Sequence, residues 1–306
     1  MLCQIAHQFP TFVSHFLEQG KTLRRRFREE TITDLLMGSL MTAGDNGIIV
    51  EFPNEPVTGA DMEWNFVNQD DNTFFRILLQ AKRAYGDGNV WKRHYYKELL
   101  HISGRGAIPQ AVILCNTART SPATFPLYIL YHPERTCALA ANAGLSNVTG
   151  VSLVNGYAIE HLVTASTTRA LRTRNKSLGQ IAPKMVPLSE LFCPLTIWPF
   201  GPMALNFSNS PFPLFIGKIG GRTEIGRAMP PTPKDVREKL VKLSSITPNI
   251  GAASGDAVRF VPEVSNEIPY EIKNLLTRRK DRLGKDNSLN RWRVTFVSAN
   301  PKSFDR

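Results

Sequence analysis

A strongly apolar segment that ends in polar residues is the feature of this sequence that most limits its fold. The apolar side chains that begin at Phe74 and end at Leu79 are followed directly by Gln80, Ala81 and Lys82. Such a run, preceded by the turn-forming residues NQDDN, predicts a strand too apolar for a solvated sheet edge. The amide and the ammonium at its end indicate that this strand leaves the core at a polar site.

The preceding segment, ADMEWNFV at residues 60–67, predicts a strand that carries an acidic pair. Asp61 and Glu63 point to one face of it, because alternate residues of a strand share a face, and Gln80 and Lys82 share a face in the same way. If the two strands are adjacent and antiparallel, these pairs meet. Carboxylate and amide oxygens can hold Mg²⁺, and an ammonium can orient water and offset phosphate charge. The pattern indicates a metal-dependent phosphodiesterase, and a solvated strand face is the alternative.

The rest of the chain predicts both helices and strands. The hydrophobic periodicity indicates helices at residues 11–28, 28–40, 91–103, 157–166, 232–245 and 271–283. Strands are expected at residues 47–52, 125–132 and 291–299, in addition to the two described above. The first three strands are expected to form a meander after the helix at 28–40. Residues 110–118 are ambiguous, because a short apolar run fits a helix or a strand.

The order of helix, three-stranded meander, helix and strand over residues 25–132 resembles the core of the PD-(D/E)xK, or restriction-endonuclease-like, nuclease superfamily. The segments EETITDLL, GADMEWNF, LLQAKR and FPLYILYH are similar to an uncharacterised bacterial subgroup with a GADWEW…QAKR pattern, whose members often lie among phage-defence genes. The resemblance implies an α/β fold with a central mixed sheet flanked by helices. It also implies a helix at residues 110–118, where Gln110 either faces the site or lies at the surface.

The resemblance further implies which residues carry the chemistry. The expected catalytic residues are Glu30, Asp61, Gln80 and Lys82. The expected ligands of Mg²⁺ or Mn²⁺ are Glu30, Asp61, Glu63 and Gln80. Glu29 is the substitute for Glu30 as the helix carboxylate. Gln80 stands where the superfamily usually has glutamate, so Glu63 is expected to supply the missing carboxylate.

A formal net charge of +11 favours a polyanionic partner, and nucleic acid before a membrane. The basic residues are clustered in KTLRRRFR and in KNLLTRRKDRLGKDNSLNRWR, which fits contacts to backbone phosphates, although solvated faces use the same residues. The expected nucleic-acid contacts are Arg24, Arg25, Arg26, Arg83, Arg278, Arg279 and Lys280.

The sequence also limits the compartment and the organisation of the chain. It has no apolar run of the roughly 18 residues that span a bilayer and no leader pattern, so a soluble cytoplasmic protein is expected. Its cysteines, Cys3, Cys115, Cys137 and Cys193, are far apart and suggest neither a disulfide framework nor a zinc site. Residues 1–180 are expected to form the nuclease-like domain. Residues 181–306 are expected to form an α+β extension of unassigned role, either separate or packed on the same domain.

The site residues, the net charge and the resemblance together predict a Mg²⁺- or Mn²⁺-dependent nuclease that hydrolyses phosphodiester bonds of DNA. The resemblance alone implies that it acts as an effector in anti-phage defence. An activating or regulatory partner protein and a homo-oligomer are compatible with this function. Three alternatives stay open. One is an inactive subunit of a defence complex that binds nucleic acid or a partner, and another is an RNase of the same fold. The third is a structural subunit of a larger complex, which the Phe- and Pro-rich residues 183–233 would serve.

Overall fold

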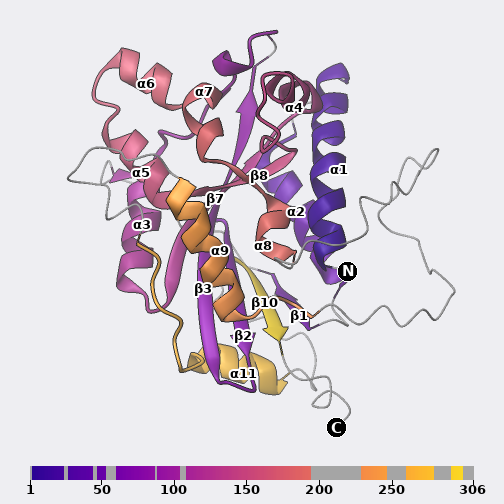
Figure 1. Ribbon diagram of the computed structural model, residues 1–306, viewed down its shortest axis with the longest axis vertical. Helices are drawn as coiled ribbons and strands as arrows, with labels where there is room; N and C mark the ends of the chain where they lie inside the picture. Colours follow the sequence, from indigo (N-terminus) through magenta and orange to yellow (C-terminus); the bar gives the residue numbers. More distant parts are fainter. Residues whose placement is uncertain are drawn as a thin grey trace, which may run out of the picture.

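The computed structural model describes residues 2–23, 27–43, 47–52, 60–86, 88–103, 108–193, 229–246, 260–278 and 291–298. In this part of the chain a mixed β-sheet is flanked by helices (Figure 1). The α/β class with a central mixed sheet, which the resemblance implies, is therefore confirmed.

The central sheet has the strand order β1-β10-β2-β3-β7-β8-β9, and β4 pairs with the end of β3. The pairs β10–β2 and β3–β7 are parallel, and the other neighbours are antiparallel. The strands of this sheet are β1 (Ile48–Glu51), β2 (Met62–Asn68), β3 (Thr73–Tyr85), β4 (Tyr95–Tyr96), β7 (Thr124–Tyr131), β8 (Val151–Asn155), β9 (Val186–Pro187) and β10 (Trp292–Ser298). A separate hairpin consists of β5 (Ile102–Ser103) and β6 (Ile108–Pro109).

The C-terminal strand β10 lies between β1 and β2, so the first three strands do not form the expected meander. Val294 and Phe296 of β10 are fully buried, and the ring of Phe296 stacks on Phe66 of β2 with centroids 4.7 Å apart. This apolar contact and two sets of backbone hydrogen bonds favour β10 over direct pairing of β1 with β2. The segment after residue 180 thus contributes β9 and β10 to the same sheet as the earlier strands.

Two clusters of buried side chains lie on the sheet. One joins alternate β2 and β3 residues such as Trp64 and Leu79 to α1, α2, α8 and α9, and the other joins Leu78 and Tyr128 to α3, α5 and α7. The longer helices are α1 (Leu2–Thr22), α2 (Glu29–Met41), α3 (Gln110–Thr120), α4 (Glu134–Ala141), α5 (Gly156–Thr164), α9 (Pro233–Ile246) and α11 (Tyr270–Arg278). The shorter helical segments are α6 (Arg169–Asn175), α7 (Leu178–Ile181), α8 (Leu188–Phe192) and the 3₁₀ turns η2 (Trp91–Arg93) and η3 (Ala182–Lys184). None of the helices described combines the length and the hydrophobicity needed to cross a bilayer.

Two segments after β3, residues 91–103 and 110–118, were expected to be helical, and only the second one is. Residues 110–118 are helical within α3, as the resemblance implies. The helix expected at residues 91–103 is wrong, because this segment forms η2 and then β4. Tyr96 of β4 pairs with Ala84 of β3, and its buried hydroxyl group lies 2.6 Å from Nε2 of His132. These tertiary contacts outweigh the local helical periodicity.

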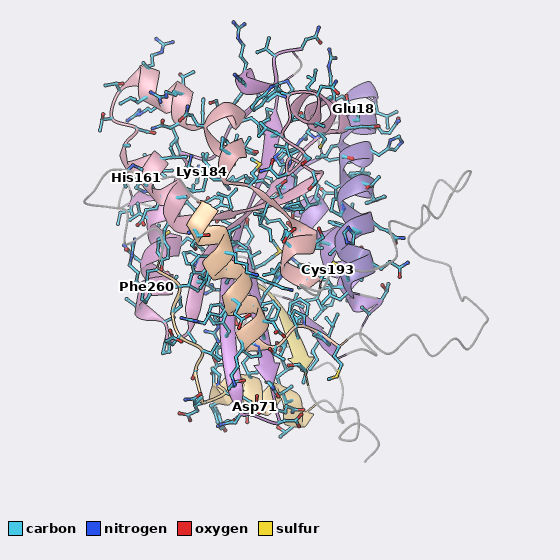
Figure 2. All side chains as sticks on the ribbon, in the orientation of Figure 1. Glu18, Asp71, His161, Lys184, Cys193 and Phe260 are labelled. Atoms are coloured by element: carbon cyan, nitrogen blue, oxygen red, sulfur yellow. A yellow bond between two sulfur atoms is a disulfide. The ribbon has the colours of Figure 1, made fainter. Side chains whose placement is uncertain are left out.

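A disulfide joins Cys3 of α1 to Cys193, which directly follows α8 (Figure 2). The expectation of no disulfide is therefore wrong. The two cysteines are 190 residues apart in sequence, but packing of α8 against α1 brings their Cα atoms to 4.8 Å. The distance in sequence concealed this pair, because the contact exists only after the helices have packed. Cys115 and Cys137 are free.

Candidate functional site

Asp61 directly precedes β2, at the end of the stretch over which β2 pairs with β3. Its backbone N–H donates to the carbonyl oxygen of Leu79 at 2.9 Å. Its Oδ2 accepts hydrogen bonds from the backbone N–H of Ala81 at 2.8 Å and from Nε2 of Gln80 at 2.5 Å. The Asp61 carboxylate therefore takes the place of a backbone carbonyl group at the end of the β2–β3 pairing, and its position is fixed by the backbone of β3.

Glu29, the first residue of α2, makes the corresponding contact two residues farther along β3. Its Oε1 accepts a hydrogen bond from the backbone N–H of Arg83 at 2.9 Å, and its Oε2 lies 3.8 Å from Nζ of Lys82. The guanidinium group of Arg83 donates to the carbonyl oxygen of Phe27. This bond holds the start of α2 against β3, so that Glu29 and Lys82 face each other. The structure thus brings Asp61, Gln80 and Lys82 together with a helix carboxylate.

The helix carboxylate at this site is Glu29 and not the expected Glu30. Glu30 is exposed, and no hydrogen bond or ion pair within the described residues holds it. It still lies close enough for its charge to raise the pKa of Asp61. The preference for Glu30 is thereby corrected: the first turn of α2 crosses β3, and only Glu29 points to the strand. Periodicity within the helix could not reveal that crossing.

The carboxylates outnumber the ammonium at this site. Burial raises the pKa of Asp61 and of Glu29, while the positive charge of Lys82 opposes the rise in both cases. Glu30 adds to the rise at Asp61, and Glu98 and Asp61 add to the rise at Glu29. A buried cluster with this excess of negative charge favours the binding of a proton or a cation.

The buried polar atoms that lack a hydrogen-bond partner among the described residues include three near the pairing of β3 with β7. They are Oε1 of Gln80, the hydroxyl group of Tyr128 and Oε1 of Gln110. Gln80 and Tyr128 are register partners on β3 and β7, and the charge of Asp61 contributes to the raised pKa of Tyr128 after the larger effect of burial. Gln110 lies one turn before Leu114, which packs in the same cluster as Tyr128. Buried polar atoms usually have partners, so these atoms suit a bound cation or water.

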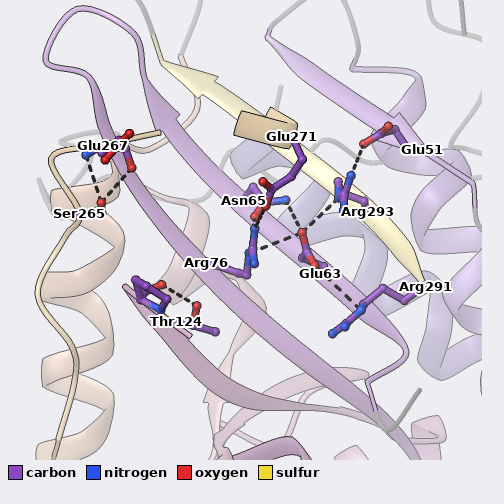
Figure 3. A network of polar contacts seen from close by, with 11 residues as sticks. Glu51, Glu63, Asn65, Arg76, Thr124, Ser265, Glu267, Glu271, Arg291 and Arg293 are labelled. Carbon is purple, nitrogen blue, oxygen red and sulfur yellow. Dashed lines mark hydrogen bonds and ion pairs between the residues drawn. The ribbon is translucent and has the colours of Figure 1, made fainter. Parts of the chain in front are cut away.

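Glu63 shares a face with Asp61 but belongs to a separate cluster (Figure 3). One carboxylate oxygen of Glu63 lies 3.1 Å from Nε of Arg293 and 3.5 Å from Nε of Arg76, and the other lies 3.9 Å from Nε of Arg291. Nδ2 of Asn65 also donates to the first of these oxygens, Oε1, at 2.9 Å. Burial would raise the pKa of Glu63, but these neighbours together hold it below its ordinary value.

The expectation that Glu63 replaces a missing metal ligand is therefore corrected, because its charge is already neutralised by arginines. Arg291 and Arg293 belong to the C-terminal end of the chain and reach Glu63 only because β10 enters the sheet beside β2. The i, i+2 rule placed Glu63 on the correct face. It could not show which partners would cover that face.

Among the expected nucleic-acid contacts, Arg83 is the one whose side chain the structure describes. Arg83 is 5% exposed, and its guanidinium group lies 5.2 Å from the ring centroid of Tyr85 in addition to its bond to Phe27. Arg83 is thus a structural residue, and the expected phosphate contact is corrected. Outside the described residues lie Arg24, Arg25, Arg26, Arg279, Lys280 and the side chain of Arg278.

Sequence reasoning missed two residues near the site. Glu98 follows β4, in a segment that was expected to be helical. Its negative charge contributes to the raised pKa of Glu29. Tyr128 lies in the fully buried strand β7, where a tyrosine reads as ordinary core. Neither residue belongs to a motif, and only the pairing of β7 with β3 places Tyr128 beside Gln80.

Comparison with known proteins gives a family without an assigned activity. A family model described as "Family of unknown function (DUF6615)" matches residues 2–303, so the chain belongs to that family. No curated protein and no solved structure matches the chain.

Proposed function

We propose that this member of the DUF6615 family is a metal-dependent nuclease that hydrolyses phosphodiester bonds of DNA, with its site at Asp61, Gln80, Lys82 and Glu29. One observation carries the proposal. Two carboxylates bind alternate backbone amides of β3, and the buried ammonium of Lys82 and the unpartnered amide oxygen of Gln80 lie on the same strand. The arrangement is the one that the resemblance to PD-(D/E)xK nucleases implies, with Glu29 in place of Glu30.

The donor set fits Mg²⁺ or Mn²⁺. Asp61 and Glu29 offer carboxylate oxygens, and the bond from Nε2 of Gln80 to Asp61 leaves Oε1 of Gln80 as an acceptor without a partner in the described structure. These hard oxygen donors suit such cations, and the excess negative charge around Lys82 favours their binding. A bound divalent cation would supply Lewis acidity toward a phosphate group and make a nearby water molecule more acidic.

Lys82 has the role of orienting water and stabilising developing charge. The side chain of Lys82 is 5% exposed, and Glu29 lies against its ammonium group from one side. A donor held in a dry site stabilises charge on phosphoryl oxygens more effectively than a mobile surface lysine does. Asp61 and Glu29 keep their orientation through backbone bonds, so the residues need little rearrangement when substrate arrives.

The choice of DNA as substrate rests on the net charge of +11 and on the resemblance. A role in anti-phage defence, together with a regulatory partner protein, rests on the resemblance alone and stays a prediction.

The proposal is tested by incubating the purified protein with supercoiled plasmid, linear duplex DNA and single-stranded RNA, each with Mg²⁺, with Mn²⁺ or with EDTA. Asp61→Asn and Lys82→Met should reduce cleavage at least 100-fold, within the range for loss of a positioned catalytic group. Glu238→Gln is the matched control, because Glu238 is an exposed carboxylate on α9. Cleavage of RNA in place of duplex DNA would change the substrate and leave the site as proposed.

Binding of Mn²⁺, measured by electron paramagnetic resonance, provides a second readout that does not require turnover. We expect one Mn²⁺ site in the wild-type protein and its loss in Asp61→Asn. Absence of both Mn²⁺ binding and cleavage would overturn the proposal, as would cleavage that Asp61→Asn and Lys82→Met leave unchanged.

A further inference from the structure

A second group of ligand-type side chains lies at the junction of α1 and α8, on elements that do not carry the site at Asp61. Cys3 and His7 are four residues apart on α1 and therefore share a face of the helix. Cys193 follows α8 and meets them there. The Sγ atoms of both cysteines and one ring nitrogen of His7 all lie within 4.8 Å of one another. Nε2 of His7 lies 3.4 Å from Sγ of Cys193.

We propose that Cys3, His7 and Cys193 form a binding site for a thiophilic divalent cation of the Zn²⁺ class when the two cysteines are reduced. The disulfide is the alternative, oxidised state of the same site. This inference is independent of the proposed nuclease function.

The donor atoms decide the class of cation. Two thiolates and an imidazole are ligands typical of Zn²⁺, whereas Mg²⁺ prefers the oxygen donors found at Asp61. Three protein ligands leave one position of a tetrahedral site to water or another donor. The three side chains are already gathered by helix packing, so cation binding requires only that the sulfur atoms separate. His7 is exposed and both cysteines are partly exposed, which lets a cation or a small thiol reach the site.

The other cysteines do not offer a comparable site. Cys115 is fully buried, and burial raises the pKa of its thiol far above the ordinary value. Burial also raises the pKa of Cys137 to about 12. Thiolates are the metal-binding form of cysteine, so these residues are matched controls for the pair at α1 and α8.

The two states of the site exclude each other by their electron and proton balance. A small disulfide such as glutathione disulfide can accept two electrons and two protons from the Cys3 and Cys193 thiols, giving the protein disulfide and two glutathione thiols. The reverse reaction, with glutathione thiols as reductant, restores both thiols. A cation then binds by displacing the two thiol protons into solution. The disulfide has no thiolate to offer, so oxidation removes the cation site.

Co²⁺ is the probe for the test, because it replaces Zn²⁺ and its thiolate complexes absorb light. Full-length protein is reduced with a phosphine under anaerobic conditions and titrated with Co²⁺. We expect one equivalent to bind with thiolate-to-cobalt charge-transfer absorption, and Zn²⁺ to remove that absorption. The oxidised protein should show none. His7→Ala should weaken binding at least tenfold, and Cys193→Ser should abolish the charge-transfer band. Cys115→Ser and Cys137→Ser should leave both unchanged.

Three results would overturn the proposal. The first is reduced wild-type protein that gives no charge-transfer band at any Co²⁺ concentration. The second is a band that persists in Cys193→Ser, which would place the ligands elsewhere. The third is an unchanged affinity in His7→Ala, which would remove the imidazole from the site. His7 is exposed, so this variant tests ligation without disturbing the core.

Discussion

Glu29 and Asp61 accept hydrogen bonds from two alternate backbone amides of one strand, those of Arg83 and Ala81. Alternate amides of a strand point to the same edge, and here both amides lie beyond the last register pair of β2 and β3, Met62 with Leu79. Two residues that are far apart in sequence are thus aligned by a single length of β3. The intervening residue, Lys82, projects from the sheet and lies 3.8 Å from Glu29. This alignment fixes the relative positions of the acidic and basic groups of the site.

Replacement of Lys82 by methionine should nearly abolish cleavage and leave the fold intact. Methionine retains a long apolar stem but lacks the ammonium that faces Glu29. We expect a loss of at least 100-fold in kcat, because a positioned cation contributes about this much to charge stabilisation. Single-turnover cleavage of a labelled duplex measures the effect, and circular dichroism checks the fold. A folded Lys82→Met protein with wild-type cleavage would remove Lys82 from the mechanism.

The adjacent carboxylates Glu29 and Glu30 should behave differently when each is changed to glutamine. Glu29→Gln removes the charge that faces Lys82, so we expect at least a tenfold loss of cleavage and weaker Mn²⁺ binding. Glu30→Gln should stay within about threefold of wild type, because only its distant charge acts on Asp61. Parallel assays of the two variants at equal ionic strength make the comparison. The opposite ranking would restore the sequence-based choice of Glu30.

The strands that create this site were predictable because their signals are local. Each signal is contained in about a dozen residues: the apolar run of β3, the acidic pair that begins at Asp61, and the helical periodicity of α2. Alternation along the strand correctly places Gln80 and Lys82 on one face. The register of β2 against β3 then brings Asp61 to Gln80, as the antiparallel arrangement requires.

The errors arose where a distant part of the chain supplies a partner. In the sequence Glu63 has no visible partner, but in the structure β10 places Arg291 and Arg293 beside it. The disulfide depends in the same way on the packing of α1 against α8. Such contacts produce no periodic pattern in the local sequence. The burial of the Arg83 side chain has the same kind of cause, because it results from the crossing of α2 over β3.

Asp61→Asn should make the stability of the protein less sensitive to pH when metal is removed with EDTA. Burial raises the pKa of Asp61 in the folded state, so the folded protein binds a proton more readily than the unfolded chain does. The free energy of unfolding of the wild type therefore falls as pH rises from the ordinary carboxyl pKa through the folded value. Because asparagine does not ionise, the free energy of unfolding of Asp61→Asn does not fall for this reason as pH rises.

The relevant measurement is urea unfolding of both proteins from about pH 3 to pH 8. The stability difference should favour Asp61→Asn more at neutral pH than at acidic pH, and added Mn²⁺ should stabilise the wild type alone. Glu238→Gln on α9 is the control for a general charge effect. A difference that does not change with pH would contradict the raised pKa of Asp61.

Glu63→Gln should destabilise the protein without weakening Mn²⁺ binding, because Glu63 serves the arginine cluster and not the proposed site. Its removal leaves Arg76, Arg291 and Arg293 without their shared carboxylate, which typically costs about 3–5 kcal/mol in a buried cluster. The pKa of Glu63 is lowered in the folded state, so its contribution is present above the ordinary glutamate pKa and is lost as pH falls through the folded value. Urea unfolding should therefore show the two proteins converging in acid. A Glu63→Gln protein of unchanged stability that no longer binds Mn²⁺ would reinstate Glu63 as a metal ligand.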